Sequence, residues 1–157
     1  MLKTSRLTSR LTARAGLAAR LALGAALVLQ APISRACEVF ADGFTILHTW
    51  TYPSQPGAID APVYFSVDSV LGADKLVRAS SLFADRVELR GSEDLTTPAL
   101  SDIAFNTATS TKVFGVGQAH LLLRGLRTPM QEGRAYMLML EFENAGKVMV
   151  MVQTSPH

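Results

Sequence analysis

His120 is the residue of this sequence whose type and setting most readily suggest chemistry. It lies in residues 117–129, GQAHLLLRGLRTP, where an extended chain puts His120, Leu122 and Arg124 on one face. An imidazole in this place can be a metal ligand, a general base or an ordinary partly buried side chain. One imidazole does not make a selective metal site, so a metal would need further ligands from elsewhere in the chain.

Methionines near the C-terminus are candidates for those further ligands. Met139, Met149 and Met151, together with Met137, alternate with apolar residues in two strand-like segments. Thioethers are soft ligands that favour Cu(I), which makes a relocated copper site on this face one hypothesis. The alternative is a packing or partner-binding patch, because methionine adapts well to apolar contacts.

The two segments predict a β-hairpin with one buried face. The turn is expected at residues 144–146, and pairing Glu143 with Lys147 predicts that Met139 lies opposite Met151. The side chains expected to line the core are Tyr136, Leu138, Leu140, Phe142, Val148, Val150 and Val152. The methionines then occupy the other face, which a simple sandwich leaves to water.

Cys37 is the single cysteine of the chain, so no intramolecular disulfide can form. It is a free thiol, a soft-metal ligand, a lipid attachment site or one half of an intermolecular bridge. The residues before it, 1–36, contain no acid, several bases and an apolar run over residues 21–33. This pattern predicts a cleaved secretory signal peptide, with an organelle transit peptide as the alternative. The run is too short to span a bilayer, which needs about 20 apolar residues.

Removal of the signal peptide would change the net charge of the chain. Six of the 15 basic residues precede Cys37 and all 13 acids follow it, so residues 37–157 carry 9 bases, 13 acids and a net charge of −4. A surface for nucleic acid is therefore not expected. Nucleophile elbows, phosphate-binding loops and two-histidine metal motifs are missing from the sequence, so we expect no enzyme. We also expect no membrane span in the mature chain.

Period-two patterns broken by turn residues dominate residues 37–157, which have the length of one domain. The strands are expected at residues 44–50, 63–67, 75–79, 86–90, 102–105, 112–116 and 117–129 and in the C-terminal hairpin. Eight or nine short strands in this length predict an all-β antiparallel sandwich.

The chain also resembles a known family, the periplasmic copper chaperones called PCu(A)C, from about Phe44 to Val152. The resemblance is carried by ILHTW at 46–50, PGA at 56–58, KLVRASS at 75–81, DRVEL at 85–89, GQAHLLLRGLRTP at 117–129, EG at 132–133 and LEFENAGKV at 140–148. It implies a Greek-key, cupredoxin-like sandwich that binds Cu(I) and hands it to an acceptor such as a cytochrome oxidase assembly factor.

The resemblance also implies a copper site of two histidines and two methionines, which this chain retains only in part. His120 matches the second histidine, whereas Arg90 stands at the first histidine and Leu122 at the second methionine. The loop expected to hold the first methionine has none between Gly91 and Ala119. A guanidinium cannot be a metal ligand and its charge opposes a cation.

Two hypotheses follow for a periplasmic or secreted protein of this kind. In the first, the chain is a copper chaperone that holds Cu(I) through His120, with Met139, Met149, Met151 and Cys37 as alternative ligands. In the second, the usual copper site has been lost and the methionine face binds another protein. We expect His48 and the single tryptophan, Trp50, to be structural.

Overall fold

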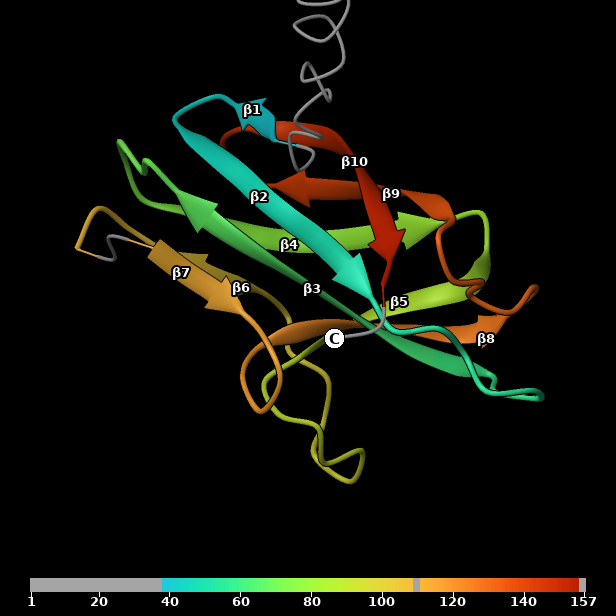
Figure 1. Ribbon diagram of the computed structural model, residues 1–157. Helices are drawn as coiled ribbons and strands as arrows, with labels where there is room; N and C mark the ends of the chain where they lie inside the picture. Colours follow the sequence, from blue (N-terminus) through green and yellow to red (C-terminus); the bar gives the residue numbers. More distant parts are fainter. Residues whose placement is uncertain (1–37, 109–110, 156–157) are drawn as a thin grey trace, which may run out of the picture. The chain divides into compact units, whose positions relative to one another are not determined.

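The computed structural model describes residues 38–108 and 111–155, which fold into ten strands and no helix (Figure 1). The strands are β1 (Val39–Ala41), β2 (Phe44–Thr51), β3 (Asp60–Asp68), β4 (Asp74–Ser81), β5 (Ala84–Arg90), β6 (Ile103–Phe105), β7 (Thr111–Phe114), β8 (His120–Leu126), β9 (Ala135–Phe142) and β10 (Gly146–Thr154). The all-β class predicted from the sequence is confirmed. The short strand β1 was not predicted, because three residues are too few for a periodic pattern.

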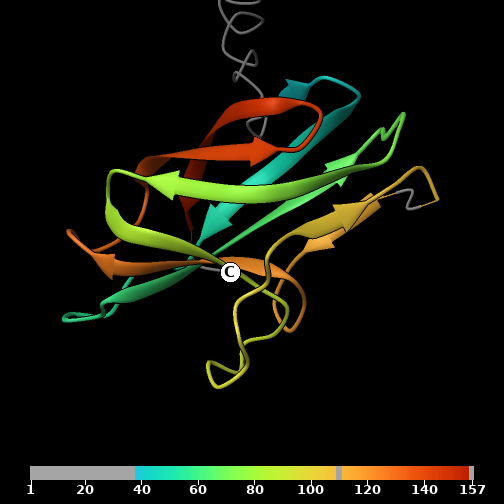
Figure 2. The ribbon, with the colours of Figure 1, turned by 180° about the vertical axis from the view of Figure 1, so that it is seen from behind.

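The strands follow the order β5-β8-β3-β2-β10-β9-β4-β6, with β1 added beside β2 and β7 beside β3. Every pairing is antiparallel except the short parallel contact between β2 and β10. β3 joins the two layers of the sandwich, because its first half pairs with β8 and its second half pairs with β2 and β7. Figures 1 and 2 both show β9 and β10 in the upper part of the view, and β5 and β8 below them.

The hydrophobic core lies between the layers and is lined by the inward rows of the strands. The row predicted for the hairpin is confirmed, since each of its members is 9% exposed or less: Tyr136, Leu138, Leu140, Phe142, Val148, Val150 and Val152. Stacked rings of Phe65 and Phe114, with centroids 4.2 Å apart, fill the core beneath β3 and β7. Burial of this apolar surface is the main force that holds the layers together.

The predicted register of the hairpin is wrong by two residues. Lys147 lies opposite Glu141 rather than Glu143, and Met149 rather than Met151 lies opposite Met139. The reason is the turn, which occupies residues 143–145 while Gly146 already pairs with Phe142. Gly146 has a φ of 73°, a left-handed conformation that glycine adopts without strain, and this places it at the start of β10.

A carboxylate outside the hairpin holds its turn in place. Asp74, the first residue of β4, accepts hydrogen bonds from the backbone N–H of Asn144 and of Ala145, each at 3.0 Å, and from that of Lys75 at 2.7 Å. Hydrogen bonds to a charged acceptor are stronger than neutral ones, and this acceptor is buried. Because these contacts are distant in sequence, periodicity within the hairpin could not reveal its register.

Candidate functional site

His120 opens β8 and lies directly opposite Arg90, the last residue of β5. Both side chains are buried, at 2% and 4% exposed. The Nδ1 atom of His120 lies 2.8 Å from the carbonyl oxygen of Gln118. A carbonyl can only accept a hydrogen bond, so Nδ1 carries the proton and the lone pair of the neutral ring is on Nε2. Nε2 is therefore the atom of this residue that can bind a metal ion.

Arg90 places a buried cation beside this imidazole. Its Nη2 donates to the carbonyl oxygen of Asp94 at 2.7 Å, and its Nη1 lies 3.6 Å from the carboxylate of Glu88. Its Nε is buried and has no hydrogen-bond partner. The guanidinium thus ties the end of β5 to the loop that follows, and its charge disfavours a metal cation at His120.

The three family positions that the sequence allowed us to align come together in space. Leu122 is two residues from His120 on the same strand, opposite Glu88, and it is 6% exposed. Successive odd or even positions of a strand share a face, so residues 90, 120 and 122 surround one point between β5 and β8. The structure therefore places these three positions side by side, and two of their three side chains cannot ligate a metal.

Aromatic side chains surround the imidazole on the β3 side. The ring of Tyr64 lies 5.7 Å from that of His120 and 4.6 Å from that of Trp50, centroid to centroid. The hydroxyl of Tyr64 donates to Glu93 at 3.3 Å, and the same carboxylate oxygen accepts from the backbone N–H of Gly117 at 3.1 Å. Glu93 thereby links the loop after β5 to the segment that leads into His120. The sequence did not indicate a role for Tyr64 or Glu93, because neither lies in a pattern that distinguishes it from its neighbours.

Tyr64 is expected to stay neutral in alkaline solution. Burial, followed by the charge of Glu93 and the hydrogen bond to it, raises the pKa of the Tyr64 hydroxyl well above its ordinary value. A raised pKa in the folded state gives stability that is complete below the unfolded value, about 10, and declines as the pH rises past it. Denaturation measured across this range should show a falling free energy of unfolding, with a shallower fall in Tyr64→Phe. An equally steep fall in that variant would contradict this assignment.

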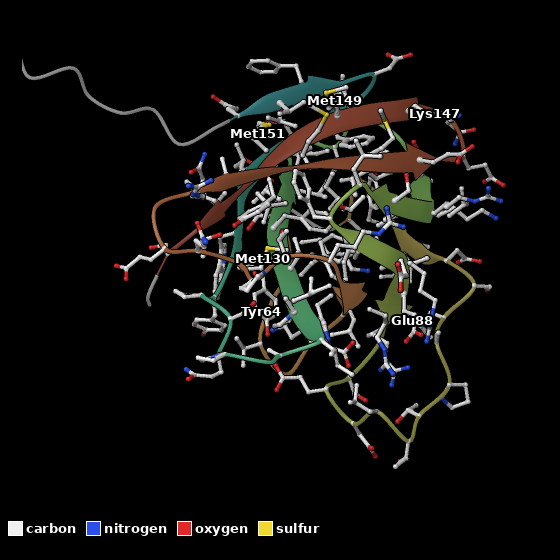
Figure 3. The ribbon with its side chains drawn as sticks, turned by 90° about the vertical axis from the view of Figure 1, so that its right-hand side faces the viewer. Tyr64, Glu88, Met130, Lys147, Met149 and Met151 are labelled. Atoms are coloured by element: carbon white, nitrogen blue, oxygen red, sulfur yellow. The ribbon has the colours of Figure 1, made fainter. Side chains whose placement is uncertain are left out.

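The methionine face lies elsewhere, on the outer side of β9 and β10, and two strands, β3 and β2, separate β10 from β8 in the strand order. Met137, Met149 and Met151 are 43%, 50% and 37% exposed, while Met139 is half-buried. Figure 3 shows Lys147, Met149 and Met151 in a row along β10, with Tyr64 and Met130 in the interior below. The structure therefore does not bring these methionines to His120.

Cys37 and His48 are two further residues that could offer a metal ligand. Cys37 lies outside the described residues. His48 is exposed in an irregular stretch between Leu47 and Trp50, where its φ of 51° marks a bulge. Within residues 38–108 and 111–155, no group of three or more His, Cys, Asp or Glu side chains is placed to hold a metal ion. That part of the chain also contains no helix long and apolar enough to cross a membrane.

Comparison with family models gives one match, "Putative lipoprotein LpqE-like", over residues 44–154. This match covers most of the chain, including the strands that carry His120 and the methionine face. The chain belongs to the LpqE-like family. No curated protein matches the sequence.

Solved structures of PCuAC domains and of DR1885 share the fold of this LpqE-like chain. The apo PCuAC domain from PmoF1 superposes with a TM-score of 0.68 at 20% identity, over 76% of this chain and all of that one. The copper-bound PCuAC domain from PmoF2 gives a TM-score of 0.67 at 20% identity, over 77% and 99% of the two chains. The Cu(I) form of DR1885 from Deinococcus radiodurans gives 0.54 at 17% identity, over 81% and 85%.

These findings confirm the predicted family and the predicted cupredoxin-like fold. At identities of 17–20%, the structural likeness concerns the fold, and site residues must be judged from this chain's own side chains. By that measure, the LpqE-like chain has a buried histidine, His120, beside a cation at Arg90 and an alkyl group at Leu122.

Proposed function

We propose that this LpqE-like protein is an exported copper carrier that binds Cu(I) and releases it to an acceptor protein. The observation that carries the proposal is the fixed tautomer of His120. Histidines that bind metals commonly donate their other ring N–H to a backbone carbonyl, which orients the ring and raises the basicity of the ligating nitrogen. The hydrogen bond from Nδ1 to Gln118 supplies this arrangement. A soft, low-coordinate site suits a carrier, because few ligands must be exchanged for release.

Export is part of the proposal and has its own support. Residues 1–36 have the composition of a signal peptide, and the family is described as one of lipoproteins. We place the protein in the periplasm or outside the cell, where an assembly factor for cytochrome oxidase is a suitable class of acceptor. The negative net charge of residues 37–157 favours attraction of a metal cation over binding of a polyanion.

Titration of the reduced protein with Cu(I), in competition with a chromogenic chelator, tests the carrier function. We expect His120 to hold one ion per chain and His120→Ala to lose that ion, because that change removes the Nε2 ligand. His48→Ala is the matched control, since His48 is an exposed histidine on β2 with no part in the site. Circular dichroism should verify that the His120 variant is folded. Binding no stronger than that of a protein without soft ligands would contradict the proposal.

A second candidate function rests on the exposure of the methionine face. Three large apolar side chains at 37–50% exposure on adjacent strands are unusual for a surface that meets only water. A protein-binding module that has lost its metal would present such a face to a partner. The same titration separates the two functions, because the module binds no Cu(I) in any variant.

A further inference from the structure

We propose that Met137, Met139, Met149 and Met151 form a second Cu(I) site, the methionine site, on the outer face of β9 and β10. The inference rests on the proposed role in copper handling, and it assigns the ion to side chains that are separate from His120. The observed register, which differs from the one expected from the sequence, places all four methionines in cross-strand pairs. Met149 lies opposite Met139, and Met151 lies opposite Met137, so the four residues form two adjacent cross-strand pairs.

The spacing of such pairs suits a single ion. Residues directly opposite each other on antiparallel strands have Cβ atoms about 4.5–5.5 Å apart. Neighbouring pairs on the same face are about 7 Å apart along the strand, because each residue rises about 3.4 Å. Methionine has three rotatable bonds between Cα and sulfur, so thioethers from both pairs can converge on a point above the sheet. Three or four sulfur ligands are then available without any movement of the backbone.

The exposure of these side chains shows that they are not retained for core packing. Met130, on the loop before β9, is 1% exposed and serves as an ordinary core residue. Met137, Met149 and Met151 are instead 37–50% exposed, so their apolar ends are in contact with water. A metal ion would give these exposed sulfur atoms a favourable partner.

A hollow and several charged side chains border the methionine site. A hollow of about 330 Å³ adjoins it, lined by Met137, Met139, Lys147, Ser80, Ser81 and Leu82. Lys147 lies opposite Glu141 on the same face, and Arg78 is 3.9 Å from that carboxylate. These charges are exposed and therefore strongly screened, so they do not prevent binding of a monovalent cation. The hollow provides a path for an acceptor's ligand to reach the ion.

The chemistry of the ligands selects the ion. Neutral thioethers are soft and bind Cu(I), whereas Zn(II), Mg(II) and Ca(II) prefer imidazole, carboxylate or carbonyl ligands. Thioethers also need no deprotonation, in contrast to thiols and imidazolium groups, so proton release should not accompany binding. An all-thioether site is also protected from the disulfide formation that removes cysteine ligands outside the cytoplasm.

Nuclear magnetic resonance of methyl-labelled methionine tests this site directly, with Ag(I) as a stable substitute for Cu(I) and Cu(I) itself under reducing conditions. We expect the methyl signals of the four residues to shift and saturate at one ion per chain, while that of Met130 stays in place. Replacement of all four by leucine, which is close in volume, should abolish this binding. Met130→Leu is the matched control and should bind as the unmodified protein does.

The ring signals of His120, recorded in the same titration, separate this inference from the copper-carrier function. Shifts of the four methyl groups that persist in His120→Ala support the methionine site. Shifts confined to the His120 ring overturn the methionine site and leave the carrier function standing. If neither group of signals responds, both proposals fall, and a face that binds protein rather than metal is the remaining role.

Discussion

Arg90→His combined with Leu122→Met is expected to strengthen Cu(I) binding at His120 by about 100-fold or more. The double variant supplies an imidazole and a thioether at two positions on the same face of the sheet as His120, because Arg90 pairs with His120 and Leu122 follows it by two residues. It also removes a buried cation. Two unit charges about 5 Å apart repel by about 3 kcal/mol at an effective dielectric constant of 20, which alone corresponds to about 100-fold in affinity.

The single variants divide this gain into its two causes. Arg90→Leu removes the charge and adds no ligand, so it should recover part of the gain through loss of repulsion. Leu122→Met adds a ligand and leaves the guanidinium in place, so it should gain little. Competition titration with a Cu(I) chelator measures all three variants against the unmodified protein. Equal affinity in the unmodified protein and the double variant would show that Arg90 does not control this site.

The double variant has a structural cost that must be measured beside its affinity. Arg90 donates to the carbonyl oxygen of Asp94 and lies near Glu88, so its loss releases the loop after β5 and leaves that carboxylate with Arg86 as its partner. A lost hydrogen bond from a charged group costs about 1.5–3 kcal/mol. Relief of the unpartnered buried Nε offsets part of that cost. Chemical denaturation should therefore accompany each titration, so that affinity is compared between folded proteins.

Alternation of apolar residues predicted most of the fold because each inward row is buried by the opposite layer. The clearest case is the C-terminal hairpin, where both apolar rows are in the core. The same alternation could not predict the register of the hairpin, because a shift by two residues keeps every side chain on its face. The contacts that decide it, from Asp74 to the turn, join positions about 70 residues apart in the chain.

The environment of His120 was predicted less well than its place in a strand. Alternation placed His120 and Leu122 on one face and Leu121 and Leu123 on the other, yet all four are 6% exposed or less. The reason is that the face that carries His120 is covered as well, by the ring of Tyr64 at 5.7 Å and by the paired residue Arg90. The hydrogen bond that fixes the tautomer and the ring of Tyr64 come from geometry that no local pattern encodes.

Leu138→Ala is expected to lower the free energy of unfolding by about 3 kcal/mol, whereas Met137→Ala, its neighbour on β9, should lower it by less than about 1 kcal/mol. Leu138 is 1% exposed and leaves a cavity when truncated, while Met137 is 43% exposed and leaves none. Urea denaturation of the two variants measures both values. A large loss in Met137→Ala would contradict the two-faced hairpin.

The stabilities of Leu138→Ala and Met137→Ala also bear on the function of the methionine face. If truncating Met137 costs little stability, packing within the chain does not explain the thioether there, and its role must involve something that the chain binds. Saturating Ag(I) then provides the decisive control, since a ligand that binds only the folded state stabilises it in proportion to its affinity. The ion should raise the free energy of unfolding of the unmodified protein and of Leu138→Ala alike, and should raise that of Met137→Ala less, because one sulfur ligand is gone.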